Sequence, residues 1–275
     1  MTSNIKSATV AEARSQGRLI LVVEDDEINR KLIRKQLDLL GYASEMVNNG
    51  AEALEQWRHG DYALILTDLH MPKMDGYMLV RAIRREESRG RIPILALTAN
   101  ALRGESTRAL EAGMDEYLTK PVQLQTLKVA LDKWLPAALE ISPPATTPES
   151  EPAPMPVDPA ALHALVGEDE AVTREFFADY LNSSRRLAAE MRAAHADGDL
   201  GLLGAVAHKL KSSSRAVGAR WLGDLCAELE KSCARGEAAF AAATMAQFET
   251  AYEDVESDIE SRLVAPRRTV GERGS

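Results

Sequence analysis

The chain has 275 residues, which is long enough for about two domains with a core each. Its formal net charge of -9 argues against a nucleic-acid-binding protein. No apolar run approaches the length of a membrane span and the N-terminus has no apolar signal core, so we expect a cytoplasmic protein without membrane insertion. The two cysteines, Cys226 and Cys233, are seven residues apart in a helical pattern, so we expect buried, reduced thiols and no disulfide.

The first half of the chain alternates between apolar runs and segments with helical spacing. Residues 1–17 are polar and are expected to be disordered. The pattern then predicts strands at 19–23, 43–47, 63–67, 92–97 and 116–118. It predicts helices at 29–40, 51–59, 75–87, 103–111 and 123–135. Five strands alternating with five helices predict an α/β domain with a doubly wound parallel sheet of the flavodoxin-like (βα)5 type.

Residues suited to phosphoryl chemistry follow four of these strands. Glu24 and Asp25 follow the first strand, Asp68 the third, Thr98 the fourth and Lys120 the fifth. The carboxyl ends of parallel strands lie at one edge of a sheet, so these side chains should converge. Three carboxylates would repel each other, and Mg²⁺ would remove that repulsion. With a lysine and a threonine added, the set predicts a pocket for a phosphoryl group, with Asp68 as the nucleophile.

Residues 18–136 resemble the receiver domain of two-component signalling through the stretches LVVEDDEINRKL, LILTDLHMPKMDG, LALTANA and GMDEYLTKPV. The resemblance implies that Asp68 becomes a phosphoaspartate. It also implies that Mg²⁺ is bound by Glu24, Asp25, Asp68 and the backbone carbonyl of His70. Thr98 and Lys120 would contact the phosphoryl oxygens. Thr98 and Tyr117 would form a switch, and the Lys120–Pro121 bond would be cis. Asp26 would lie outside the metal ligands. A degenerate receiver that binds a partner without phosphorylation is the alternative.

A proline-rich segment separates the two halves. Eight of the 12 prolines lie within residues 136–159, with alanine, serine, threonine and glutamate between them. This composition predicts an extended, semi-stiff linker over residues 137–158.

The second half is predicted to be all-α. Helical patterns cover 159–166, 170–196, 200–217, 219–234 and 237–263, with turn signals between the long ones. Four long amphipathic helices with short turns predict an antiparallel four-helix bundle over residues 159–264. The polar residues 265–275 are expected to be a disordered tail.

His208 is the informative residue of the helix predicted at 200–217. At about 100° per residue it lies about 140° from the centre of the apolar stripe, so we expect it to face solvent. Gly204, Lys211, Ser212 and Arg215 should share its face, where small neighbours leave room for a partner and the cations favour an acidic pocket.

The run AHKLKSSSRAVGA resembles the histidine phosphotransfer (HPt) domain, which carries a phosphoryl group on an exposed histidine of a four-helix bundle. The matching positions are His208, Leu210, Lys211, Ser213 and Gly218, and the departure is Ser212, where glycine is usual. The resemblance implies that His208 is the phosphorylated residue.

Together the two resemblances predict a phosphorelay protein. Asp68 takes a phosphoryl group from a sensor histidine kinase, and His208 exchanges it with receiver aspartates, including that of a downstream receiver domain. No nucleotide-binding loop is apparent, so we expect a phosphoryl carrier without ATP-dependent kinase activity, in which hydrolysis at Asp68 is the one further activity left open. Two alternatives remain: an interaction protein in which His208 is inert, and the C-terminal part of a hybrid histidine kinase.

Overall fold

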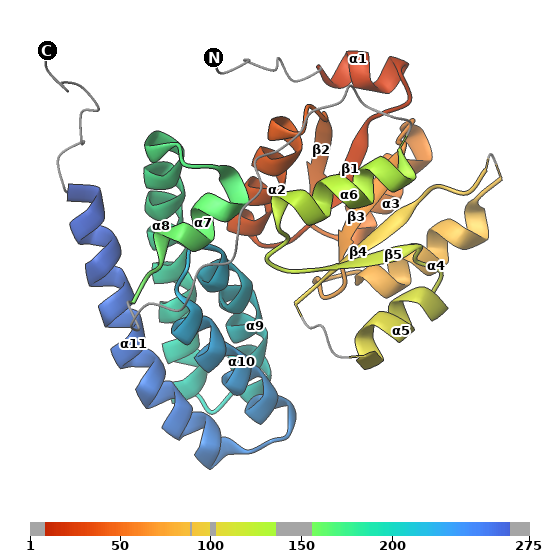
Figure 1. The fold of residues 1–275 in the computed structure, drawn as a ribbon. Helices are drawn as coiled ribbons and strands as arrows, with labels where there is room; N and C mark the ends of the chain where they lie inside the picture. Colours follow the sequence, from red (N-terminus) through yellow and green to blue (C-terminus); the bar gives the residue numbers. More distant parts are fainter. Residues whose placement is uncertain (1–8, 89, 100–102, 136–155, 265–275) are drawn as a thin grey trace, which may run out of the picture. The chain divides into compact units, whose positions relative to one another are not determined.

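The computed structural model describes residues 9–88, 90–99, 103–135 and 156–264 (Figure 1). The chain divides into two compact units. The first consists of the N-terminal half together with residues 160–169, and the second consists of residues 152–159 together with the chain from 170 onward. The residues predicted to form most of the linker and the C-terminal tail lie outside the described part of the chain.

The first unit contains a five-stranded parallel sheet, as the sequence predicts. The strand order is β2-β1-β3-β4-β5, with β1 Ile20–Val23, β2 Ser44–Val47, β3 Leu64–Asp68, β4 Ile94–Thr98 and β5 Glu116–Thr119. The helices that alternate with the strands are α2 Glu27–Leu39, α3 Gly50–His59, α4 Gly76–Glu86, α5 Arg103–Glu111 and α6 Leu124–Trp134. This is the order of the flavodoxin-like doubly wound fold.

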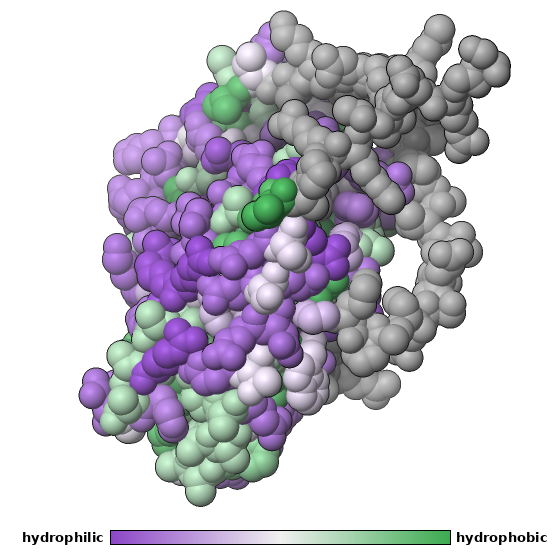
Figure 2. All heavy atoms as spheres, turned by 90° about the vertical axis from the view of Figure 1, so that its left-hand side faces the viewer, coloured by the Kyte–Doolittle hydropathy of each residue, from purple (hydrophilic) through white to green (hydrophobic). Residues whose placement is uncertain are grey.

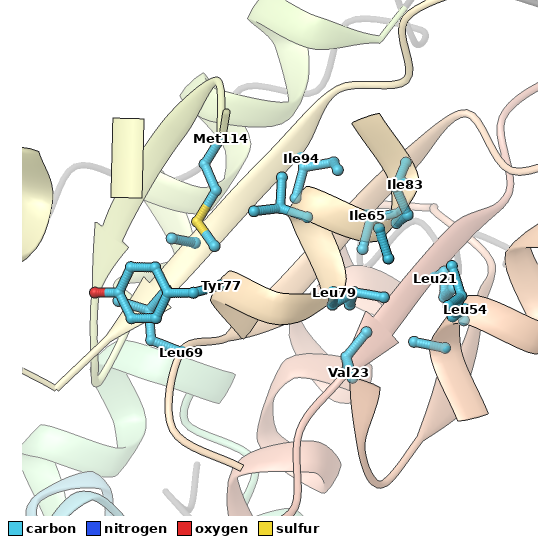
Figure 3. Packing of buried hydrophobic residues seen from close by; sticks show 14 of the residues in the cluster. Leu21, Val23, Leu54, Ile65, Leu69, Tyr77, Leu79, Ile83, Ile94 and Met114 are labelled. Carbon is cyan, nitrogen blue, oxygen red and sulfur yellow. The ribbon is translucent and has the colours of Figure 1, made fainter. Parts of the chain in front are cut away.

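Both faces of the sheet are covered, which explains why the central strands are continuous apolar runs. Successive side chains of a strand point to opposite faces. Leu21 and Ile65 therefore pack with α3 and α4 on one face (Figure 3), in one hydrophobic cluster. Their neighbours Ile20 and Leu64 pack with α2 and α6 on the other face. Every residue of β1, β3 and β4 is buried, so these strands form a rigid support for whatever follows their carboxyl ends.

A helix near the N-terminus corrects the expectation that residues 1–17 are disordered. Residues Val10–Ser15 form α1, and Thr9 and Glu12 close a capping box at its start. Ala13 is buried against Leu19 and Ala43, which fastens the helix to the sheet. The T-x-x-E spacing of the cap was the available signal in the sequence. Residues 1–8 are not described.

The second unit is a closed four-helix bundle, as predicted. Its helices are α8 Glu170–Ala196, α9 Leu200–Ala216, α10 Arg220–Ala234 and α11 Ala238–Val264, and each contacts two neighbours in the cyclic order α8, α9, α10, α11. Buried hydroxyl pairs join α8 to α9 through Tyr180 and Ser214 (2.9 Å) and α8 to α11 through Ser184 and Tyr252 (3.2 Å). Both cysteines are free and buried in α10, as predicted.

The outer side of α8 and α11 is polar. Figure 2 shows mostly hydrophilic residues on the side where α11 lies in Figure 1. Arg192 and Glu249 pair across these two helices at 2.6 Å, and so do Arg185 and Glu256. Among the described residues, no helix combines the length and apolar character that crossing a membrane requires.

The end of the predicted linker is part of the folded bundle. Val157 is fully buried, and the Asp158 N–H donates to the Gly218 carbonyl at 3.1 Å. Gly218 has a φ of 90°, and a Cβ there would lie 2.0 Å from the Asp158 carbonyl oxygen, so only glycine admits this contact. Helix α7 (Pro159–Val166) has the predicted bounds, but residues 160–169 group with the first unit.

Candidate functional site

The sheet register brings the predicted acidic residues to one edge. Val23 pairs with Thr67 in the register of β1 with β3, which sets Glu24 beside Asp68 at the carboxyl ends of the two strands. Asp68 in turn pairs with Leu97 of β4, one residue before Thr98. Lys120 follows β5, and its N–H donates to the Thr98 carbonyl at 2.7 Å. All the strand-end residues predicted for the site therefore meet at this edge.

Three carboxylates form a compact cluster there. Glu24, Asp25 and Asp68 each offer a carboxylate oxygen, and these oxygens lie within 4.8 Å of one another. Glu24 and Asp68 are buried, whereas Asp25 is half-buried. Hard oxygen donors of this kind suit Mg²⁺, so the residues present fit the predicted ion.

Lys120 supplies a positive charge inside the cluster. Its Nζ lies 2.5 Å from Asp68 Oδ2 and 2.7 Å from Glu24 Oε2, and the lysine side chain is almost fully buried. Burial alone would lower the pKa of Lys120, but the two carboxylates raise it above its ordinary value. The ammonium is therefore charged at neutral pH and available to contact anionic oxygens.

Burial acts on the pKa values of two carboxyl groups at this edge, those of Glu24 and Asp26. Burial raises the pKa of Glu24, and the Lys120 ammonium opposes that shift. Asp26 is also buried, which raises its pKa to about 6. Its carboxylate caps α2 by accepting from the Asn29 N–H at 2.9 Å. This capping role agrees with the expectation that Asp26 lies outside the metal ligands.

The loop after β3 shapes the surroundings of Asp68. The His70 N–H donates to Asp68 Oδ1 at 3.2 Å, while the His70 side chain is exposed. A Cβ on Gly76 would lie 2.3 Å from the Asp68 carbonyl oxygen, so only glycine lets the start of α4 approach the strand end so closely. The predicted switch residues differ in exposure, since Thr98 is buried and Tyr117 is 41% exposed. The Lys120–Pro121 bond is cis, as the resemblance implies.

His208 lies on α9, but its surroundings correct the sequence-based picture of a free, solvent-facing ring. Its side chain is only 18% exposed, and its Nδ1 lies 2.7 Å from Glu230 Oε1 on α10. Helix α10 covers the face of α9 that the apolar stripe alone left open. The helical wheel of one segment cannot show this, because the stripe identifies only one of the two neighbouring helices.

Lys211 and Glu230 complete the polar cluster around His208. Lys211 is buried, and its Nζ lies 2.5 Å from Glu230 Oε2 and 3.4 Å from His208 Nδ1. Burial alone would raise the pKa of Glu230, but hydrogen bonds and charge from His208 and Lys211 lower it to about 2. Glu230 is therefore ionised at neutral pH and can only accept hydrogen bonds.

The residues predicted to support docking beside His208 are mostly turned inward. A Cβ on Gly204 would lie 3.0 Å from the Cys233 Cβ, so this glycine makes room for α10 and not for another protein. Ser212 is buried as well, and Arg215 is half-buried and pairs with Asp224 at 2.6 Å. The expectation that these four neighbours form an open face is therefore wrong, because α10 covers it.

Glu230 is a site residue that the sequence does not reveal. It lies 22 positions beyond His208 on a different helix, in a run with several other charged residues. Its partial burial depends on the packing of α10 against α9, which brings it to His208. A glutamate on the inner side of the α10 pattern, next to the apolar Leu229, was the only available signal.

Comparisons with known proteins find a family match for each half of the chain. Residues 20–132 match the family described as the response regulator receiver domain, and residues 175–258 match the Hpt domain. The virulence sensor protein BvgS of Bordetella pertussis is 32% identical over 228 residues, which cover 80% of this chain and 18% of BvgS. The sensor histidine kinase RcsC of Escherichia coli K12 is 40% identical over 127 residues, covering 46% of this chain and 13% of RcsC. The chain therefore spans less than a fifth of either relative.

Two solved structures are also similar to part of this chain. The receiver domain of the sensor histidine kinase PA1611 from Pseudomonas aeruginosa PAO1 is 42% identical, and the match covers 43% of this chain and 97% of that one with a TM-score of 0.41. A chain of the co-crystal of the Saccharomyces cerevisiae phosphotransfer protein Ypd1 with the Ssk1 receiver domain is 31% identical, covering 42% and 87% with a TM-score of 0.40. With one family match on each unit, the chain carries a response regulator receiver domain followed by an Hpt domain.

Proposed function

We propose that this chain is a phosphorelay protein in which Asp68 and His208 are the two phosphoryl carriers. The observation that carries the proposal is the buried Lys120 ammonium, 2.5 Å from Asp68 and 2.7 Å from Glu24, at the sheet edge where three carboxylates meet. A bare cluster of surface acids would have no such internal cation. The arrangement has the parts that phosphoryl transfer needs, namely a positioned nucleophile and groups that neutralise charge.

At the first carrier, a carboxylate oxygen of Asp68 attacks phosphorus as the bond to the donor histidine of a sensor kinase breaks. The electron pair of that P–N bond stays on the departing imidazole, and an acyl phosphate forms on Asp68. Mg²⁺ bound by Glu24, Asp25, Asp68 and the His70 carbonyl would supply positive charge for the phosphoryl oxygens. The receiver domain of PA1611 is described with a magnesium ion in its active site cleft, which supports this assignment.

The protein's own groups complete that step. Lys120 can move from the Asp68 carboxylate to a phosphoryl oxygen without leaving the pocket, since Asp68 is already its neighbour. The Thr98 hydroxyl at the end of β4 donates to a second phosphoryl oxygen. We further propose that Tyr117, exposed on the neighbouring strand, turns inward once Thr98 has moved toward the phosphoryl group.

At the second carrier, the cluster on α9 and α10 sets the reactive nitrogen. Ionised Glu230 cannot donate, so the 2.7 Å contact requires that His208 Nδ1 carry the proton. Nε2 then holds the lone pair that attacks phosphorus, while the acyl oxygen–phosphorus bond of a phosphoaspartate breaks and its electron pair returns to the carboxylate. Lys211 supplies a cation beside the ring.

The partners we propose are a sensor histidine kinase as donor and a receiver domain as the exchange partner of His208. The Ypd1 co-crystal joins a histidine phosphotransfer protein to a receiver domain, which supports the second partner. The relatives BvgS and RcsC are a virulence sensor and a sensor histidine kinase. We therefore keep the alternative that this chain is one part of a hybrid histidine kinase. The cytoplasmic location stays a prediction.

The test is incubation with a sensor kinase phosphorylated on histidine and, separately, with a phosphorylated receiver domain, each followed by separation of acid-labile from base-labile label on this chain. Phosphohistidine and acyl phosphate differ in this stability. We expect Asp68→Ala to abolish the acyl phosphate and His208→Ala to abolish the phosphohistidine. If signalling survived in His208→Ala with no phosphohistidine in the wild type, the helical unit would be an interaction module with an inert histidine.

A further inference from the structure

A single arginine holds the acidic turn that follows β1. Arg30 lies in the first turns of α2, and its Nη1 donates to the Glu24 carbonyl at 2.8 Å and to the Asp25 carbonyl at 3.1 Å. Its backbone N–H donates to the Asp26 carbonyl at 3.0 Å. Three consecutive carbonyls of the turn therefore accept from the same residue.

This turn is where the sheet stops providing support. The Glu24 N–H makes the last ladder bond, to the Val47 carbonyl at 3.1 Å. The Glu24 carboxylate is still held, because Lys120 lies 2.7 Å from it. Asp25 comes one residue later, is half-buried, and has its two flanking peptide groups fixed by the guanidinium of Arg30.

We propose that Arg30 is a positioning residue for the magnesium site: by fixing these two peptide groups it holds the Asp25 carboxylate toward Glu24 and Asp68. The inference rests on the proposed function, since it concerns the ion needed at Asp68. Arg30 would then strengthen Mg²⁺ binding, although its positive charge alone would weaken it. A nearby cation repels Mg²⁺, whereas a clamp that orients a ligand strengthens binding.

Positioning of Asp25 and the charge of Arg30 would change the Mg²⁺ affinity in opposite directions, so a measurement of that affinity separates them. Mg²⁺ affinity is measured by isothermal titration calorimetry on the full chain, comparing the wild type with Arg30→Gln, Arg30→Lys and the control Arg34→Gln. Arg34 lies one turn further along α2 and is exposed, so its removal changes the charge of the same helix without touching the turn. We expect Arg30→Gln to bind Mg²⁺ about tenfold or more weakly and Arg34→Gln to stay within about twofold of the wild type.

Each result decides the matter. Unchanged Mg²⁺ affinity in Arg30→Gln would mean that Arg30 stabilises the turn without affecting the metal site. Tighter binding would mean that Arg30 acts on Mg²⁺ only through its charge. Either result overturns the inference. If Arg30→Gln does not fold, Arg30→Lys decides. Lysine keeps the charge, but its shorter side chain withdraws the donor from the two carbonyls, so this variant should bind Mg²⁺ several-fold more weakly. Affinity equal to or tighter than that of the wild type overturns the inference. A wild type that binds no Mg²⁺ would instead refute the proposed function.

Discussion

Glu230 Oε1 lies 2.7 Å from His208 Nδ1, and the two residues come from neighbouring helices of the bundle. The contact fixes both the ring orientation and the position of its proton. His208, which the sequence alone places in open solvent, is therefore half-buried with its Nδ1 facing Glu230. This leaves Nε2 as the ring nitrogen that we propose to be reactive.

Glu230→Ala should therefore slow phosphoryl arrival at His208. A hydrogen bond to a charged group contributes about 1.5–3 kcal/mol, which corresponds to about 10- to 100-fold in rate if it is used in the transition state. The measurement is the initial rate of phosphohistidine formation from a phosphorylated receiver domain. Glu228→Ala is the matched control, because Glu228 is exposed on the same helix and pairs only at the surface with Lys231.

Glu230→Gln separates geometry from charge. The amide oxygen can still accept from Nδ1, so this variant should retain most of the rate that Glu230→Ala loses. Equal rates in the wild type and Glu230→Ala would show that the contact has no part in transfer.

Asp26→Asn should stabilise the metal-free protein at neutral pH. Burial raises the pKa of Asp26 to about 6 from an ordinary value of 3.8, so the folded state binds the proton more tightly than the unfolded state does. Stability is therefore lost as the pH rises from about 4 to above 6, and the loss is at most about 3 kcal/mol. Asparagine keeps the cap of α2 without the charge.

The check is urea unfolding in EDTA at pH 7.5 and at pH 3.5. We expect a gain of about 1–3 kcal/mol in the free energy of unfolding at the higher pH and a gain near zero at the lower pH. A loss of stability at pH 7.5 would mean that the Asp26 carboxylate is ionised at no cost in the folded state.

Gly76→Ala should push the start of α4 away from the Asp68 backbone at the end of β3. Its Cβ would lie 2.3 Å from the Asp68 carbonyl oxygen, and backbone cannot yield as a flexible side chain would. We expect a loss of about 1–3 kcal/mol in stability, as for other overpacked sites, together with slower phosphorylation of Asp68. Gly201→Ala is the control, since its nearest contact is a flexible carboxylate oxygen at 3.3 Å. Equal stability of the two variants would show that α4 can shift freely.

Chelation should stop the first transfer. With Mg²⁺ removed by EDTA, the carboxylates of Glu24, Asp25 and Asp68 repel an incoming phosphoryl group, and Lys120 is the only cation among the predicted site residues at this edge. We expect uptake of label at Asp68 to fall at least 100-fold and to return when Mg²⁺ is added in excess. Asp25→Asn should weaken that return. Uptake that continues unchanged in EDTA would contradict the magnesium assignment.

The sequence predicts the sheet edge well because local signals determine it. The continuous apolar runs of β1 and β3 mark buried parallel strands, and the strand ends place Glu24 and Asp68 side by side once the sheet order is known. Helix bounds followed from apolar spacing in the same way. Helix α1 gives no such signal, because its six residues bury only Ala13.

The surroundings of His208 could not be predicted from local pattern. A helical wheel shows which side of α9 is apolar, but the packing of α10 against Gly204 determines what covers the remaining side. The roles of Gly76 and Arg30 depend on backbone atoms, the carbonyls of Asp68, Glu24 and Asp25, and residue spacing carries no signal for such contacts.

The most direct test of the two-carrier account is site mapping by mass spectrometry after timed exposure to a phosphorylated sensor kinase and Mg²⁺, in the intact chain and in Asp68→Asn. We expect phosphate on Asp68 at the earliest times, phosphate on His208 once a phosphorylated receiver domain is supplied, and no label at position 68 in the variant. Phosphate confined to other residues, with both Asp68 and His208 unmodified, would contradict it.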